Sequence, residues 1–266
     1  AVNHIDLGLG RRVLSTLSEE ELQEIIPGRR EYSLFESAEA REVAVKLGRT
    51  RIIRLKNRYH WGTNETSLEM VNQQLDILGR IKQLDASRMD KNVPIVVLDW
   101  GAGTGRALAE LSEELKKQVI TNVRLYGFSK ESYLQEWQNA PEGITFIFDT
   151  IDNFDTIMAK EKIKIDLVYS FSGIERLLET QRKDRLDIEH FRQLRGFLTS
   201  QGEIRMAFGV KSSKLTEAGF VYQEVLLDHY DVPYEIYKPQ EEDSKGLQDP
   251  ATLSEDQRIL NPQTPG

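Results

Sequence analysis

Short apolar runs alternate with helix-like segments from Pro94 onward, and this alternation restricts the possible folds more than any other feature of the sequence. Most of the runs are largely apolar rather than alternating, which is typical of strands that are buried on both faces of a parallel sheet. Helical patterns fall between most of the runs, as the crossover connections of a parallel sheet require. We therefore expect seven strands, at residues 95–98, 123–128, 144–148, 165–169, 203–208, 220–227 and 232–237.

The last two runs are separated by only a few residues, which is too short for a crossover helix. These two strands should therefore pair as an antiparallel hairpin. The predicted fold is α/β: a Rossmann-like, seven-stranded, mostly parallel sheet with a C-terminal antiparallel hairpin and helices on both faces. The helical patterns lie at residues 106–117, 130–138, 174–198 and 212–218.

The length of 266 residues exceeds the usual size of one domain, so an accessory region beside the α/β core is expected. We expect a mostly helical accessory or lid region at residues 1–90. The core should occupy residues 91–238, and the polar residues 239–266 should form a flexible tail.

Two capping-box patterns support helices in the first ninety residues: Ser18 is followed by Glu21, and Thr66 by Glu69. A single helix that begins at Thr66 would carry an apolar stripe at intervals of three and four residues. This stripe should pack against the core, and it consists of Leu68, Val71, Leu75, Leu78 and Ile81.

The composition excludes several classes of function. The sequence has no cysteine, which excludes disulfides, thiolate metal sites and a cysteine nucleophile. No apolar run reaches the roughly 18 to 20 residues of a membrane span, and the first residues lack the apolar segment of a signal peptide. We therefore expect a soluble, cytoplasmic protein with no membrane partner.

The charge distribution bears on nucleic-acid binding. A net charge of -8 argues against a surface that is basic all over, as nucleic-acid binding would favour. Residues 41–58 are nevertheless basic, from Arg41 to Arg58, with little acid between them. This stretch is interpreted as a solvated face, with a surface for an anionic partner as the alternative.

Three glycines at alternate positions, Gly101, Gly103 and Gly105, come directly after the first expected strand, and Asp99 precedes them. In an open α/β sheet the ligand lies beyond the carboxyl ends of the strands, where the strand order reverses. Glycines at that place allow a tight turn and a close approach of the backbone to a ligand. The dinucleotide fingerprint is not matched, because Arg106 stands at the position of its third glycine, and no Walker loop follows.

The stretch Leu98-Asp99-Trp100-Gly101-Ala102-Gly103-Thr104-Gly105 resembles motif I of class I (Rossmann-like) S-adenosylmethionine-dependent methyltransferases. Weaker resemblances follow in the family's order. Residues 165–170 are similar to its fourth strand, residues 198–204 to the turn into its fifth strand, and residues 217–220 to its helix–Ala-Gly-Phe–strand join. The resemblance implies S-adenosylmethionine as the cofactor, with Asp99 holding its amino-acid moiety and its bed shaped by Gly101, Ala102, Gly103 and Gly105.

The same resemblance implies further cofactor contacts. The family usually carries a ribose-binding acid at the end of its second strand, where this sequence has Ser129, whose hydroxyl lacks the charge that strengthens such a bond. Glu131 could substitute for it. Asp149, before Thr150, stands where the family often binds the adenine amino group, and the alternative is that Asp149 is the N-cap of a helix starting at residue 151. The implied cofactor site is completed, at the end of the fourth strand, by Tyr169 and Ser170.

The catalytic residues stay undetermined, because methyl transfer requires chiefly alignment of the acceptor and, for a hydroxyl, removal of a proton. Tyr59, His60 and Trp61 precede the helix that should cover the cofactor, so they are candidate lid or substrate contacts, with His60 and Tyr59 as weak catalytic candidates. The alternative is an aromatic cluster that anchors the accessory region. His190 is a weaker candidate base, and no metal site is expected from the spacing of His, Asp and Glu.

Two functional hypotheses remain. One is S-adenosylmethionine-dependent methyl transfer to an oxygen or nitrogen atom of a small molecule or protein. The other is a methyltransferase-fold protein without turnover that acts as a binding partner or scaffold, since one fold hosts many functions. Methylation of nucleic-acid bases is disfavoured, because the fourth strand is not followed by an Asn/Asp-Pro-Pro-Tyr loop and the sequence has no cysteine.

Overall fold

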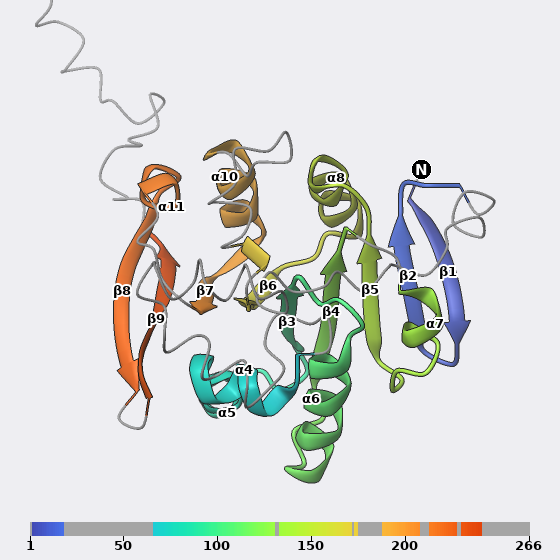
Figure 1. The fold of residues 1–266 in the computed structure, drawn as a ribbon, viewed down its shortest axis with the longest axis horizontal. Coiled ribbons are helices and arrows are strands. Elements are labelled where there is room, and N and C mark those ends of the chain that lie inside the picture. The colour runs from blue at the N-terminus through green and yellow to red at the C-terminus, as the bar shows by residue number, and fades with distance from the viewer. Residues whose placement is uncertain are drawn as a thin grey trace, which may run out of the picture.

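The computed structural model describes residues 2–18, 66–130, 133–171, 173–174, 188–207, 213–227 and 230–240. The strands of these residues form one nine-stranded sheet in the order β1-β2-β5-β4-β3-β6-β7-β9-β8 (Figure 1). Six neighbouring strands run parallel: β2 (Arg11–Ser15), β5 (Ile144–Phe148), β4 (Val123–Ser129), β3 (Ile95–Trp100), β6 (Ile165–Ser170) and β7 (Leu198–Ala207).

The C-terminal hairpin closes one end of the sheet. Strand β9 (Tyr230–Pro239) pairs antiparallel with β7 and with β8 (Phe220–Leu227). Every residue of β3, β5 and β6 is buried, which explains why these strands are mostly apolar. The predicted mostly parallel sheet with a C-terminal antiparallel hairpin is confirmed.

Helices cover both faces of the sheet, as predicted (Figure 1). On one face, an apolar cluster joins the sheet to α4 (Leu68–Leu75), α5 (Ile77–Ser87), α6 (Arg106–Lys117) and α7 (Leu134–Trp137). On the other face, a second cluster joins it to α8 (Ile151–Glu161), α10 (Ile188–Phe197) and α11 (Ser213–Glu217). Among the helices in the described ranges, none is long and apolar enough to cross a membrane.

Within the α/β core, two connecting segments differ from their predicted form. The helix expected at residues 130–138 is reduced to the single turn of α7. The turn expected before the fifth strand is part of β7, where Ile165 pairs with Leu198 but Leu167 pairs with Glu203. The extra residues between these two pairs form a bulge, so the segment turns without leaving the sheet.

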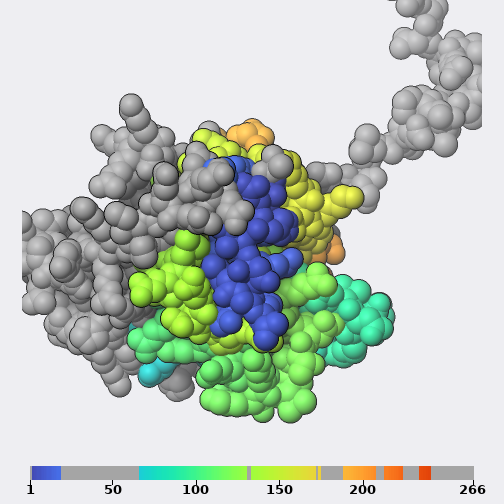
Figure 2. All heavy atoms as spheres, turned by 90° about the vertical axis from the view of Figure 1, so that its right-hand side faces the viewer, coloured from blue at the N-terminus to red at the C-terminus, as the bar shows by residue number. Residues whose placement is uncertain are grey.

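The N-terminal residues form strands, and the prediction of a mostly helical region is wrong for residues 3–15. Strands β1 (Asn3–Gly8) and β2 (Arg11–Ser15) make an antiparallel hairpin, and β2 pairs in parallel with β5. The hairpin raises the strand count from the expected seven to nine. Val13 and Leu14 of β2 are fully buried on opposite faces of the sheet, so they extend both apolar clusters. Figure 2 shows the hairpin spread across this edge of the molecule.

The predicted single helix from Thr66 is divided into α4 and α5 at Asp76, whose φ of 48° lies in the left-handed region. Its N-cap is Ser67 rather than Thr66, since the Ser67 side chain accepts a hydrogen bond from the amide of Met70. The break has a tertiary cause. The guanidinium of Arg205, on β7, donates to the carbonyls of Leu75 and Asp76 at 2.7 and 2.8 Å, so these carbonyls have a partner outside the helix.

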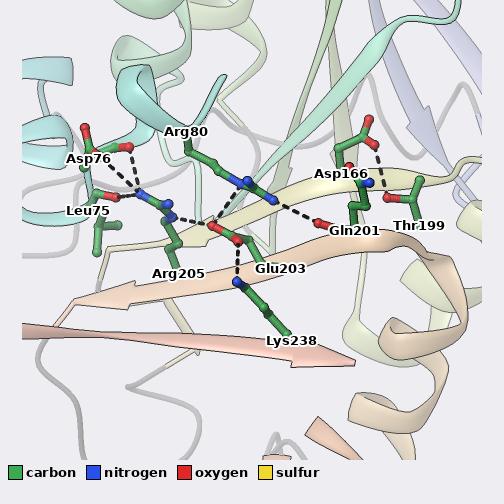
Figure 3. A network of polar contacts seen from close by, with 9 residues as sticks. All are labelled: Leu75, Asp76, Arg80, Asp166, Thr199, Gln201, Glu203, Arg205 and Lys238. Carbon is green, nitrogen blue, oxygen red and sulfur yellow. Dashed lines mark hydrogen bonds and ion pairs between the residues drawn. The ribbon is translucent and has the colours of Figure 1, made fainter. Parts of the chain in front are cut away.

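A buried polar network holds this helix break against the sheet (Figure 3). The carboxylate of Glu203 lies 2.6 Å from Nε of Arg205 and 3.2 Å from Nε of Arg80, on α5. Lys238, on β9, lies 3.9 Å from the same carboxylate. The network joins α4, α5, β7 and β9, and it therefore fixes the helices on the face that α6 also covers.

Candidate functional site

The strand order reverses at β3, which pairs with β4 on one side and with β6 on the other. The chain proceeds from β3 through β4 to β5 on one side of this point, and from β6 to β7 on the other side. The carboxyl ends of β3 and β6 therefore flank the switch point at which open α/β sheets bind their ligands. Trp100 ends β3 and Ser170 ends β6, so the glycine turn begins at this point.

Backbone hydrogen bonds to the end of β4 fix the glycine turn between β3 and α6. The amides of Gly101 and Ala102 donate to the carbonyl of Phe128, at 3.0 and 2.9 Å. Gly101, Gly103 and Gly105 have φ values of 104°, 51° and 80°, which favour glycine. Gly103 and Gly105 are buried, whereas Gly101 is exposed, so Gly101 is the glycine of this turn that solvent reaches.

An aromatic platform supports this turn from the side of α7. Trp137 is fully buried, stacks on Phe146 with ring centroids 4.7 Å apart, and donates its indole N–H to the carbonyl of Gly103 at 3.0 Å. A Cβ atom at Gly105 would lie 2.7 Å from the Phe146 ring. The role of Trp137 was not predicted, because its contact with Gly103 depends on the packing of α7.

Asp99 and Tyr169 meet across the switch point. They are direct partners in the β3–β6 register, and the Tyr169 hydroxyl donates to the Asp99 carboxylate at 2.9 Å. Both side chains are buried. Burial raises the pKa of Asp99 to about 7, and the hydrogen bond from Tyr169 opposes that rise. Burial and the neighbouring carboxylate raise the pKa of Tyr169 well above its ordinary value, so the hydroxyl is the donor.

Ser170 organises the segment that follows β6. Its hydroxyl donates to the Trp100 carbonyl at 3.2 Å and accepts from the amides of Gly173 and Ile174 at 3.1 and 2.8 Å. A Cβ atom at Gly101 would lie 3.1 Å from Cα of Gly173, so two backbone segments meet at the candidate site. Gly173 was not predicted as a site residue, because its neighbours are distant in sequence.

Asp149 binds the end of strand β2. Its carboxylate accepts from the Thr16 amide at 2.9 Å, from the Thr16 and Ser15 hydroxyls, and from the Asn153 side chain at 2.8 Å. The N-cap of α8 is Thr150, which corrects the alternative interpretation of Asp149 by one residue. Burial alone would raise the pKa of Asp149, but these hydrogen bonds together lower it below its ordinary value. Its predicted contact with adenine stays a prediction.

The remaining predicted residues fall into two groups. Ser129 ends β4 and is buried opposite Phe148, and His190 lies on α10 with Nε2 3.0 Å from the Asp152 carboxylate on α8. His190 is thus on the face of the sheet opposite α6. The others lie outside the described residues, namely Glu131, Tyr59, His60, Trp61 and the basic stretch 41–58. Within the described ranges, no group of three or more His, Asp or Glu side chains could hold a metal ion.

The strand order, the glycine turn and the buried acid define a doubly wound α/β protein whose candidate site lies at the switch point. No protein-family model matches the sequence, and no curated protein matches it.

Several solved structures are similar to this chain. MnmC2 from Aquifex aeolicus is 15% identical, with a TM-score of 0.42 over 64% of this chain and 60% of its own. The CMeT domain of the citrinin polyketide synthase is 12% identical, with a TM-score of 0.49 over 79% of this chain and 59% of its own. A putative class I S-adenosylmethionine-dependent methyltransferase from Listeria monocytogenes is 14% identical, with a TM-score of 0.40 over 70% of this chain and 64% of its own. The match spans less than two thirds of each structure, and at these identities and TM-scores it carries no functional conclusion.

Proposed function

We propose that this chain is an S-adenosylmethionine-dependent methyltransferase that acts on an oxygen or nitrogen atom of a small-molecule or protein acceptor. The observation that carries the proposal is the position of Asp99. Its buried carboxylate lies at the carboxyl end of β3, two residues before the glycine turn and beside the switch point. An ionised carboxylate at this place offers a charge-assisted partner for the ammonium group of S-adenosylmethionine.

The glycine turn fits a cofactor that lies against the backbone. The turn is already held by the Phe128 carbonyl and by the Trp137 indole, so little ordering is needed when a ligand binds. Side chains at Gly101 or Gly105 would collide with Gly173 or Phe146, so the turn keeps this shape only with glycine at these positions. When bound, S-adenosylmethionine supplies an electrophilic methyl group, and the protein has to orient the acceptor toward it.

The acceptor side of the proposal rests on residues that sequence reasoning selected. Tyr59, His60 and Trp61 are proposed as lid or acceptor contacts, since they precede α4, which packs on α6. For a hydroxyl acceptor, a base has to remove the proton, and His60, Tyr59 and His190 are the candidates. His190 is the weakest of the three, because it lies on α10, on the face of the sheet opposite α6.

A second candidate function is a binding protein or scaffold that uses the methyltransferase fold without turnover. Two observations favour it. Ser129 has no charge for the ribose, and the Asp149 carboxylate is already engaged by Ser15, Thr16 and Asn153. Both features weaken the nucleoside end of the proposed cofactor site, while the Asp99 end is unaffected.

Isothermal titration calorimetry with S-adenosylmethionine and S-adenosylhomocysteine at pH 8 tests which of the two candidate functions is correct. We expect micromolar binding that Asp99→Ala abolishes and that Asp152→Ala, a change at a mostly exposed acid, preserves. Binding would justify a screen of oxygen and nitrogen acceptors for methyl transfer. If the folded wild-type protein binds neither compound, the enzyme proposal fails and the scaffold alternative gains support.

A further inference from the structure

The Asp99–Tyr169 pair is set by the sheet itself. The two residues are Cα partners on adjacent parallel strands, and a distance of 2.9 Å joins the Tyr169 hydroxyl to Oδ2 of Asp99. Asp99 is 5% exposed and Tyr169 is 1% exposed, so both side chains lie within the closely packed interior. The backbone of β3 and β6 therefore determines where the carboxylate points.

The other elements around Asp99 bring no competing charge among the described residues. Its partner on β4 is Gly127, and the nearest side chains to that glycine are Leu108, Ala102 and Phe146. On the far side of Tyr169, the next residue in the register is Arg205 of β7.

The charge of Arg205 is directed elsewhere. Its guanidinium is bound by Glu203 and by the carbonyls of Leu75 and Asp76, and it lies over the ring of Tyr234 at 5.6 Å. The pKa of Tyr234 is raised by its burial, so this phenol is neutral near pH 7. Tyr169 is therefore the side chain in the described ranges that acts directly on Asp99.

We propose that Tyr169 is a positioning residue whose hydroxyl holds the Asp99 carboxylate in the orientation that receives the ammonium group of S-adenosylmethionine. The inference rests on the proposed function and deepens it. Tyr169 itself acts through Asp99 and transfers no proton. Its pKa lies well above the ordinary value of tyrosine, so its hydroxyl stays protonated.

The hydrogen bond also affects whether Asp99 is ionised or neutral. Burial raises the pKa of Asp99 to about 7, and the bond from Tyr169 stabilises the ionised carboxylate against that effect. Without the hydroxyl, the pKa would rise further. The carboxylate would then be mostly neutral at pH 7, and cofactor binding would weaken there and recover at higher pH.

Tyr169→Phe tests this role, with Tyr237→Phe as the matched control. Tyr237 is also fully buried and donates to a carboxylate, that of Glu235 at 2.8 Å, but it lies on β9. We expect Tyr169→Phe to weaken S-adenosylhomocysteine binding about tenfold or more at pH 7 and by less at pH 9. The pH midpoint of binding should move upward, and Tyr237→Phe should leave it unchanged.

The titration of Asp99 provides a readout that needs neither a cofactor nor a stable variant. In the wild-type protein, the carboxyl carbon of Asp99 and the ring carbon Cζ of Tyr169 should shift at one common midpoint in carbon-13 NMR spectra. Separate midpoints, or a Tyr169→Phe protein with wild-type affinity at every pH, would overturn the positioning role alone. If the wild-type protein binds neither nucleoside compound, the proposed function fails as well.

Discussion

Asp149, at the end of β5, accepts hydrogen bonds from both the backbone amide and the hydroxyl of Thr16, the residue that follows β2. The contact joins residues 133 positions apart in the sequence. It fastens the N-terminal hairpin to the start of α8, because the same carboxylate also accepts from Thr150 and Asn153. The carboxyl edge of the sheet is thus built partly by the first residues of the chain.

Asp149→Asn should therefore destabilise the protein by about 2 kcal/mol, because an amide offers one acceptor where several donors converge. Urea denaturation at pH 7 measures the change. Asp152→Asn, at an exposed acid in the first turn of the same helix, should change the free energy of unfolding by less than about 0.5 kcal/mol. Equal effects at the two positions would contradict a special role for the Thr16 contact.

Asp99→Asn should stabilise the protein at pH 8 and leave it nearly unchanged at pH 4. The folded-state pKa of Asp99, about 7, lies above its ordinary value of 3.8. The protein is therefore more stable at low pH and loses stability as the pH rises from about 4 to about 7, where Asp99 has to ionise in the interior. A shift of this size corresponds to a gain on the order of 4 kcal/mol at most. Unfolding curves of the wild-type and Asp99→Asn proteins at several pH values test this. A stability difference that does not depend on pH would argue against a buried Asp99 with a raised pKa.

Gly105→Ala should cost far more stability than Gly143→Ala. Both glycines have positive φ, 80° and 89°, so each substitution carries a backbone cost of about 1 kcal/mol. Only at Gly105 would the new Cβ also meet the Phe146 ring, whereas nothing lies within 4 Å of a Cβ at Gly143. We expect a total loss of about 3 kcal/mol at Gly105 in thermal unfolding. Similar losses at both glycines would show that the aromatic platform is not tightly packed against the turn.

Glu203→Gln should destabilise the protein by about 3 kcal/mol, because it removes the nearest carboxylate from the buried guanidinium of Arg205. The other carboxylate, that of the partly exposed Asp76, lies 3.7 Å away. The exposed pair of Glu189 and Arg192 supplies the control, and Glu189→Gln should cost less than about 0.5 kcal/mol. Chemical denaturation separates the two expectations. A small loss at Glu203 would mean that the network in Figure 3 does not hold the break between α4 and α5.

Val119→Gly should stabilise the protein by about 1 kcal/mol. This β-branched residue has a φ of 61° after the end of α6 and is 81% exposed, so its side chain costs strain and gains little burial. Val119→Asn, which also tolerates this conformation, should stabilise as well. Val93→Gly, at an exposed valine without positive φ, should destabilise, and a gain there would remove the conformational explanation.

Part of this protein is determined locally, by the sequence itself. Helix α6 spans Arg106–Lys117, as its pattern predicts, and the strands from β3 to β6 lie where continuous apolar runs predict them. Local signals suffice there because a strand buried on both faces is apolar at most positions, and a strand-to-helix turn of this shape requires glycine. The glycine turn was predicted from its glycines, and Asp99 was selected because it lies two residues before the first of them.

Tertiary structure decided the rest. The hairpin β1–β2 forms strands because β2 pairs with the edge of β5. Helix α4 ends before Asp76 because Arg205 binds its last carbonyls, and Asp149 accepts a hydrogen bond from Thr16. The partner of Asp99 is likewise 70 residues away. None of these contacts lies within one turn or one strand of the chain, so periodicity and capping patterns carry no trace of them. They arise only when the sheet register brings distant residues into one row.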